Sequence, residues 1–375
     1  MLLPPRLVDK YTYSDLLLAY FDCRKKKRST MPSTAFEVRY EFNLMDLLDE
    51  INAGTYKVGR SRAFVVTWPK VREVWAAQFR DRIVHHLICR DIAPFFTARL
   101  IEDTFACIPG RGTLAAAQRA EQFARRITEN WQKKVYILQI DIKNYFCSIS
   151  RAIMWNILKE HIGDSSLTAR LTKMIVFHDP TNNPIVKPGT DFSIVPRHKS
   201  LWHCKPGYGL PIGNLTSQVF ANVYLDAFDH YVKHVLKCRY YVRYVDDAIL
   251  MAKDKNLLLD WRYTLDEWLQ RHRELMLHPD KVRLAPVRDG FTFVGRTIRP
   301  FRSIARKMTL ASTVEAARQL QKFPQDQDAI VTLNSYLGML QHGSMYAFRR
   351  KICSMVRLPG VVGCDPEYTK IFSLL

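Results

Sequence analysis

Two features that mark membrane and secreted proteins are missing from this sequence. The 375-residue chain contains no run of 18 or more apolar residues, so no segment is long enough to cross a bilayer as a helix. Residues 1–10 lack the charged and then apolar pattern of a secretory signal peptide. From these absences we expect a cytoplasmic protein with no membrane partner.

Cysteine motifs and repeats are missing as well. The eight cysteines are scattered, with no Cys-x-x-Cys motif and no Cys/His cluster at zinc-binding spacing, which argues against a zinc site. Several lie in apolar runs, where a free cysteine behaves as a small hydrophobic residue. We therefore expect reduced, structural cysteines. No internal repeat or low-complexity tract occurs, which excludes a solenoid.

Positive charge is what the sequence has in excess. It holds 56 Lys and Arg against 36 Asp and Glu, for a formal net charge of +20 and a pI near 9.6. With 47% hydrophobic residues, the chain can build a proper core for two or three subdomains. A folded protein this basic usually binds a polyanion, and nucleic acid is the commonest one.

Apolar patterns predict the order of the main elements. Helices are expected around residues 16–21 and 44–51, and a strand over 64–68 that Pro69 ends. An apolar run at 135–140 predicts a buried strand that ends on Asp141. Residues 179–206 read as an irregular insertion and residues 216–236 as one long helix. From residue 301 onward the pattern is helical and basic.

Three acids occupy the ends of predicted strands. Asp246 and Asp247 lie at the tip of an expected hairpin with strands over 240–245 and 248–252. Taken alone, such a pair is more often an ordinary turn, and Asp141 alone a solvated strand end. Brought together, three carboxylates can bind two divalent cations about 4 Å apart. Oxygen ligands with open positions suit Mg²⁺, and Mn²⁺ is a possible substitute.

Two of these segments resemble motifs of reverse transcriptases. The run Tyr-Val-Asp-Asp at 244–247 resembles their active-site hairpin, and residues 141–146 resemble their first catalytic motif. The resemblance implies that Asp141, Asp246 and Asp247 are the catalytic metal ligands. It also implies that Phe146 lies under the sugar of the incoming nucleotide, where it would clash with a 2′-hydroxyl and favour dNTPs. Core packing is the alternative role for Phe146.

Further segments extend the resemblance over roughly residues 10–350. They are similar to the fingers motifs at 69–72 and 80–82, to the template-contacting segment at 104–113, to the loop beneath the template–nucleotide pair at 209–218, to the lysine region at 277–281 and to the primer grip at 293–295. The nucleotide-binding residues that the resemblance implies are Lys70, Arg72, Phe146, Ile212, Gly213, Gln218 and Lys281. The template or primer contacts that it implies are Arg111, Gly112, Phe293, Val294 and Gly295.

The resemblance also implies a fold and partners. We expect an α+β right-hand polymerase with N-terminal helices and fingers over 1–134, a palm with an antiparallel sheet backed by helices over 135–300, and a helical basic thumb over 301–375. Template RNA, nascent DNA and dNTPs would be the partners. Ile212 and the pair Ser217-Gln218 resemble the form found in diversity-generating retroelements, which use a small basic accessory protein. Related antiphage defence enzymes pair with a noncoding RNA.

Three alternatives remain open at this stage. An RNA-dependent RNA polymerase would usually carry Gly before the two acids and a polar residue at position 146, so Val245 and Phe146 argue against it. A catalytically inert RNA-binding scaffold of the same fold would need the same positive charge. Priming from the protein itself cannot be assigned to any one of the many Tyr and Ser residues.

Overall fold

The computed structural model describes residues 3–25, 31–68, 70–357 and 362–373. The strand end expected at Pro69 lies outside these residues. Among the described residues, no helix combines the length and the apolar character needed to cross a membrane.

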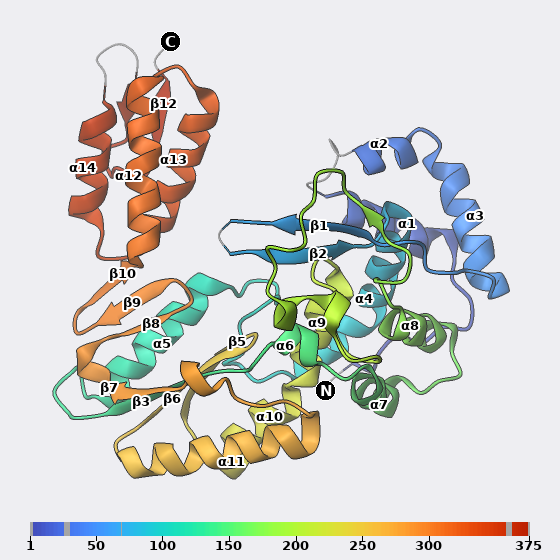
Figure 1. Cartoon of the computed structure of the whole chain (residues 1–375), viewed down its shortest axis with the longest axis horizontal. Helices are drawn as coiled ribbons and strands as arrows, with labels where there is room; N and C mark the ends of the chain where they lie inside the picture. The colour runs from blue at the N-terminus through green and yellow to red at the C-terminus, as the bar shows by residue number, and fades with distance from the viewer. Residues whose placement is uncertain (1–2, 26–30, 69, 358–361, 374–375) are drawn as a thin grey trace.

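A four-stranded antiparallel sheet forms the middle of the molecule, with strand order β5-β6-β3-β7. Its strands are β3 Tyr136–Asp141, β5 Tyr240–Tyr244, β6 Asp247–Ala252 and β7 Arg283–Pro286. Both faces are covered, because successive side chains of β3 point in opposite directions. Leu138 packs in the core cluster that includes the helix α11 Lys255–Arg273, and Ile137 packs in the cluster that includes α5 Thr113–Ile127. Figure 1 shows the sheet between these two helices.

N-terminal helices pack on one another beside this sheet. They are α1 Tyr13–Arg24, α2 Met31–Glu37, α3 Tyr40–Ala53 and α4 Phe79–Arg99. A capping box at Thr12 starts α1, and Gly54 in the left-handed conformation ends α3. The two helices α7 Arg151–Ile162 and α8 Leu167–Phe177 join the same core, and the side chain of Ser150 caps α7.

A second, smaller sheet projects from the N-terminal part. Its strands are β1 Arg62–Val66, β2 Arg72–Ala76 and β4 Ile185–Val186, with β1 and β2 antiparallel and β4 parallel to β1. The observed strand therefore begins and ends two residues before the expected 64–68. The segment 179–206 is mostly irregular, but it also supplies β4 and the 3₁₀ turns η1 Arg197–Lys199 and η2 Leu201–His203. Leu201 of η2, with Phe192 and Cys204 of the same segment, packs against Ala63 and Trp75 on one face of the hairpin.

The expected single helix over 216–236 is interrupted. The structure has α9 Leu215–Tyr224, α10 Asp226–His230 and the π-helical stretch η3 Tyr231–Val235. At Leu225 the amide bonds the carbonyl of Asn222, which tightens the turn, and the Leu236 amide then bonds Tyr231 five residues earlier. The apolar pattern missed these changes because buried residues continue on both sides of them.

The C-terminal part consists of a small sheet and a helical bundle. Its elements are β8 Phe291–Phe293, β9 Arg296–Arg299, β10 Arg302–Ala305, α12 Lys307–Lys322, α13 Gln327–Leu340, α14 Tyr346–Val356, β11 Val362–Cys364 and β12 Ile371–Ser373. The three helices share their own apolar core and stand apart from the central sheet in Figure 1. An antiparallel sheet backed by helices, with further helical parts, confirms the predicted α+β class.

Candidate active site

Strand pairing brings the three acids together. Asp141, the last residue of β3, lies opposite Asp247, the first residue of β6, in the antiparallel register. Asp246 is the neighbouring turn residue, and its carbonyl accepts a 3.1 Å hydrogen bond from the amide of Ile142. Residues 105 positions apart in the sequence thus share one end of the sheet. This is the convergence that the sequence patterns predict.

The hairpin tip is held in a strained conformation. Val245, which precedes Asp246, has a φ of 57°, a conformation that β-branched residues rarely adopt. Its carbonyl accepts a 3.0 Å hydrogen bond from Nη1 of Arg243. Strain of this kind persists only where the surroundings fix it, and Arg243 supplies that constraint.

Burial and mutual repulsion oppose ionisation of two of the acids. The pKa of Asp246 is raised by burial and then by the charge of Asp141, against smaller opposite effects of Lys281 and Arg72. Loss of hydration at the tip, followed by the charges of Asp246 and Asp141, raises the pKa of Asp247 to about 7. Asp247 retains solvent contact, so its proton can exchange with water. The tip therefore concentrates negative charge that a cation would neutralise.

Lys281 is the cation that faces this cluster directly. Its Nζ lies 2.8 Å from Oδ1 of Asp141. The 3₁₀ turn η4 Pro279–Lys281 positions it, and the amide of His278 at the start of that turn bonds the carbonyl of Asp141 at 2.8 Å. Lys281 is thus fixed to β3 through both its backbone turn and its side chain.

An open cavity of about 140 Å³ adjoins the acids, and the primer-grip candidates help to line it. Asp141, Asp247 and Lys281 form one side, and Phe293 and Val294 form another. The turn between β8 and β9 places Val294 at φ 43° and Gly295 at φ 84°. Nε2 of Gln139 on β3 donates to the carbonyl of Thr292 at 2.8 Å, which ties this turn to the sheet.

Phe146 and the glycine-rich loop lie next to each other. Phe146 is half-buried on the short helix α6 Tyr145–Ser148, and its carbonyl accepts a 2.8 Å hydrogen bond from the amide of Leu210. Within the loop, Gly213 has φ +120°, and a Cβ there would lie 2.9 Å from Val74 Cγ1. Only glycine fits this close approach to β2. The carbonyl of Ile212 accepts from the amide of Trp75 at 2.8 Å, and Gln218 is exposed on the first turn of α9.

The remaining residues predicted to contact nucleotide or template differ in whether their side chains are already engaged within the protein. Lys70 is exposed in the turn between β1 and β2, and Arg72 is exposed at the start of β2, with its charge felt at Asp246. Arg111 is engaged within the protein, because its Nη1 donates to the carbonyls of Ile101, Glu102 and Thr104. Gly112 precedes α5 with an extended backbone and open space around it.

Sequence reasoning missed a buried polar network behind the hairpin. The guanidinium of Arg243 pairs with Asp229 on α10, whose carboxylate also accepts hydrogen bonds from Tyr241 and Thr104 at 2.6 and 2.7 Å. Arg243 directly precedes the Tyr-Val-Asp-Asp run at 244–247. No local pattern in the sequence predicts that Asp229 is its partner.

The oxygen atoms of the three acids are suitable ligands for divalent cations, although the side chains are not already arranged as a metal site. Within the described ranges, no group of three or more His, Cys, Asp or Glu side chains stands ready to hold a metal ion. Burial and the neighbouring carboxylates raise the pKa values of Asp246 and Asp247, so a bound cation would favour their charged forms. Asp141 is meanwhile bound to Lys281. The donor set consists of oxygens only, which suits Mg²⁺.

Comparisons with known proteins point in one direction. The family model for reverse transcriptase (RNA-dependent DNA polymerase) matches residues 69–298. Protein YkfC of Escherichia coli (strain K12) is 21% identical over 316 residues, which are 75% of this chain and 77% of that protein.

Two solved structures are similar in outline. Telomerase from Candida albicans, in complex with a fragment of telomeric RNA, aligns with a TM-score of 0.43, 12% identity and 85% of this chain. Apo telomerase from Candida tropicalis aligns with a TM-score of 0.47, 12% identity and 64% of this chain. The matches span 61% and 53% of those two chains.

Proposed function

This chain belongs to the reverse transcriptase family, and we propose that it is an active RNA-directed DNA polymerase that extends a DNA strand from dNTPs on an RNA template. The observation that carries the proposal is the register of β3 and β6, which places Asp141 opposite Asp247 with Asp246 beside them. Three carboxylates at one sheet end, next to a lysine and an open cavity, suit phosphoryl transfer.

In this proposal Asp141, Asp246 and Asp247 are the metal ligands. Two Mg²⁺ ions held there would supply neutralisation of the triphosphate and activation of the primer hydroxyl. Lys281 bonds Asp141, and it would turn to the leaving pyrophosphate when a cation replaces it beside the carboxylate. Arg72 and Lys70, both exposed on the hairpin, would bind the triphosphate from the opposite side.

The sugar and the base of the incoming nucleotide would meet different elements. Phe146 would contact the sugar and disfavour a 2′-hydroxyl, and the loop that contains Ile212, Gly213 and Gln218 would lie beneath the base pair. The turn over Phe293, Val294 and Gly295 lines the cavity or adjoins it, which supports a contact with the primer end. Gly112, open to solvent, would contact the template; Arg111 would support that segment through its carbonyl bonds.

We assign the parts of the polymerase as fingers and N-terminal helices over 1–134, palm over 135–300 and thumb over 301–375. The β1–β2 hairpin projects toward the side on which the helices α12–α14 stand in Figure 1. Nucleic acid would lie between these parts, and the net charge of +20 would attract its negatively charged phosphates.

For the biological role we propose diversity generation, or antiphage defence together with a noncoding RNA. Ile212 replaces an amide that many relatives carry, and an apolar residue beneath the nucleotide would loosen base selection. A small basic accessory protein would belong to the first role. Sequencing the RNA and DNA that copurify tests the two: products mutated at adenines support diversity generation, and repetitive DNA supports defence.

The activity itself is tested by primer extension on a primed RNA, with dNTPs and NTPs compared in the presence of Mg²⁺, of Mn²⁺ and of a chelator. We expect DNA synthesis that needs a divalent cation and prefers dNTPs. Preference for NTPs would identify an RNA polymerase instead. Absence of synthesis under all conditions, with tight RNA binding retained, would identify an inert RNA-binding scaffold.

A further inference from the structure

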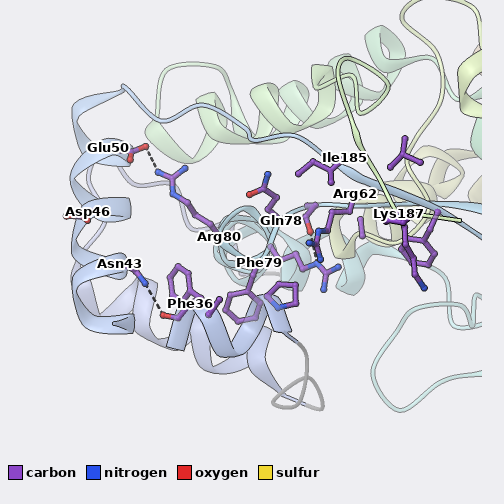
Figure 2. Close-up of a pocket in the computed structure, with 18 residues that line it drawn as sticks. Phe36, Asn43, Asp46, Glu50, Arg62, Gln78, Phe79, Arg80, Ile185 and Lys187 are labelled. Carbon is purple, nitrogen blue, oxygen red and sulfur yellow. Dashed lines mark hydrogen bonds and ion pairs between the residues drawn. The ribbon is translucent and has the colours of Figure 1, made fainter. Parts of the chain in front are cut away.

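A large pocket lies away from the three acids, at the base of the β1–β2 hairpin. It has a volume of about 860 Å³ and is open to solvent. Helices α2 and α3, the start of α4 and the strand β4 complete its walls. Figure 2 shows Phe36, Asn43 and Glu50 on one side and Arg62, Ile185 and Lys187 on the other. Ligand sites typically have volumes of roughly 300–1,000 Å³.

Two arginines that line this pocket, Arg62 and Arg82, have no carboxylate partner. Nε of Arg82, which is half-buried, donates to the carbonyl of Ala77 at 2.9 Å. Neither Arg82 nor Arg62 forms an ion pair with any described residue. Burial lowers the pKa of Arg82, and the nearby charge of Arg62 lowers it further. Because both arginines line one pocket, an anion bound there would neutralise both charges.

The acids of the pocket do not neutralise this pair. Glu50 is engaged by Arg80, as the dashed line in Figure 2 shows. Asp46 is exposed at the rim. Lys187 adds a further exposed cation on the opposite wall and has no ion pair among the described residues. The pocket therefore carries an excess of positive charge beside Arg62 and Arg82.

Aromatic rings supply the other half of the pocket. Phe36 and Phe79 lie with their ring centroids 5.3 Å apart, and Phe64 and Ile185 add apolar surface. Phe36 is half-buried, so part of its ring is open to a ligand. A bound molecule would meet an apolar wall next to two unpaired guanidinium groups. A nucleotide has this combination of a flat ring and a phosphate.

We propose that this pocket binds one unpaired ribonucleotide of an RNA strand, with its phosphate between Arg62 and Arg82 and its base against Phe36. The inference rests on the proposed function in one respect, because RNA is taken to be the nucleic acid that the chain engages. Two sources supply RNA of this chemistry: the strand that is being copied and a separate structured RNA.

The position of Arg62 connects the pocket with the rest of the hairpin. Arg62 pairs with Ala76, and Arg72 pairs with Val66 four residues further along β1. Because alternate residues share a face, Arg62 and Arg72 project from the same side of the hairpin, about 13 Å apart along the strand at ~3.3 Å per residue. One RNA strand can therefore contact both arginines.

The experiment measures RNA affinity as a function of salt for the full chain and for Arg62→Gln, Arg82→Gln and Phe36→Ala. Arg271→Gln on the distant helix α11, exposed in the structure, is the matched control. The probes are an RNA–DNA hybrid with a blunt end, the same hybrid with an unpaired 5′ RNA extension, and an RNA hairpin with an unpaired loop. Each arginine variant should reduce the salt slope by about 0.7, and Phe36→Ala should weaken binding roughly tenfold, only for probes with unpaired nucleotides.

Loss confined to the extended hybrid would assign the nucleotide to the strand being copied, and loss on the hairpin would assign it to a separate RNA. Both results support the pocket. Affinities and slopes that match those of Arg271→Gln on every probe would overturn it. Crosslinking of 4-thiouridine in the unpaired segment of the unaltered protein gives a test without variants, with the adduct expected on residues 35–36 or 78–82.

DNA synthesis by the unaltered protein, measured beside RNA binding, separates this inference from the proposed activity. If the unaltered protein never synthesises DNA but the extension still strengthens binding through Arg62 and Arg82, the polymerase proposal fails and the pocket is supported. If synthesis occurs and the arginine variants leave binding unchanged on every probe, the pocket is overturned and the polymerase proposal stands.

Discussion

Arg243 and Asp229 form an ion pair enclosed within the protein. Two parallel hydrogen bonds join them, from Nε at 2.7 Å and from Nη2 at 2.6 Å, and the residues are 1% and 0% exposed. The second guanidinium arm of Arg243 holds the carbonyl of Val245, next to Asp246. The pair therefore links the helix α10 to the conformation of the catalytic hairpin.

Removal of one partner should destabilise the fold. Asp229→Asn would leave Arg243 buried beside a neutral amide, which typically costs about 3–5 kcal/mol. Denaturant unfolding followed by circular dichroism measures this loss. Arg271→Gln, which breaks an exposed pair with Glu267, should cost less than about 1 kcal/mol. Equal decreases in the free energy of unfolding in the two variants would show that the enclosed pair stabilises the fold no more than an exposed pair does.

Arg243→Lys tests the positioning role apart from stability. Lysine keeps the charge but cannot bond Asp229 through two arms and Val245 through a third. We expect kcat for nucleotide addition to fall roughly tenfold or more, as misplacement of catalytic groups does, with little change in KM for the dNTP. Single-turnover primer extension measures both. A change confined to KM would contradict a role in positioning the acids.

Substitution of the acids should separate synthesis from binding. Asp141→Asn, Asp246→Asn and Asp247→Asn would each remove a charge from the proposed metal site, and synthesis should fall by about three orders of magnitude or more. RNA affinity should be kept or increased, because repulsion toward phosphates decreases. Asp260→Asn, on an exposed position of α11, is the control. Activity that survives all three changes would exclude the two-metal mechanism.

The pKa of Asp247 predicts how stability depends on pH when divalent cations are absent. Its folded-state pKa is raised to about 7 from an ordinary value of 3.8, so the folded protein binds this proton more tightly than the unfolded chain does. The stabilisation is complete below about pH 4 and is lost as the pH rises through about 7. In EDTA, the melting temperature of Asp247→Asn should exceed that of the unaltered protein at pH 7.5 and not at pH 4. Parallel pH curves would contradict this.

Phe146 should set the choice between dNTPs and NTPs. Phe146→Val would open space at the sugar, and the ratio of kcat/KM for dNTP over NTP should fall at least about tenfold. Phe146→Tyr keeps the ring and should retain most of the discrimination. Competition between labelled dATP and ATP on one primed RNA measures the ratio. An unchanged ratio in Phe146→Val would restore the packing role as the explanation for this residue.

Lys281 should act on the chemical step. Its Nζ faces Asp141 in the structure, and Lys281→Met should lower kcat by about 10²-fold if the lysine assists the leaving pyrophosphate. Lys281→Arg should recover part of the rate, since the charge is kept. Lys255→Met, exposed at the start of α11, should be silent. A pH–rate profile that is the same for Lys281→Met and the unaltered protein would contradict a proton-transfer role.

The positions of the three acids were accessible from the sequence because local patterns carry them. Apolar runs mark β3, β5 and β6, and each acid stands at the end of one of these runs or beside it. An antiparallel pairing of such strands has few possible registers once both faces are buried. The helix over 216–236 was predicted without its breaks, because apolar spacing continues through Leu225 while the backbone does not.

Contacts that join distant segments had no such signal. Asp229 lies among apolar residues of a predicted helix, and only the packing of α10 behind β5 brings its carboxylate to Arg243. Arg82 belongs to a segment that resembles a fingers motif and Arg62 has no motif of its own, and only the folded hairpin and α4 place the two in one pocket.

The sequence by itself determined the strands β3, β5 and β6 and the acids at their ends, since hydrophobic periodicity is a local property of the chain, but it did not indicate β7. The tertiary structure decided what surrounds those acids. Lys281 reaches Asp141 across 140 positions of sequence, and Arg243 fixes Val245 only because Asp229 neutralises it in the interior. A buried charge needs a partner of opposite charge. Which residue becomes that partner depends on how the elements pack in three dimensions.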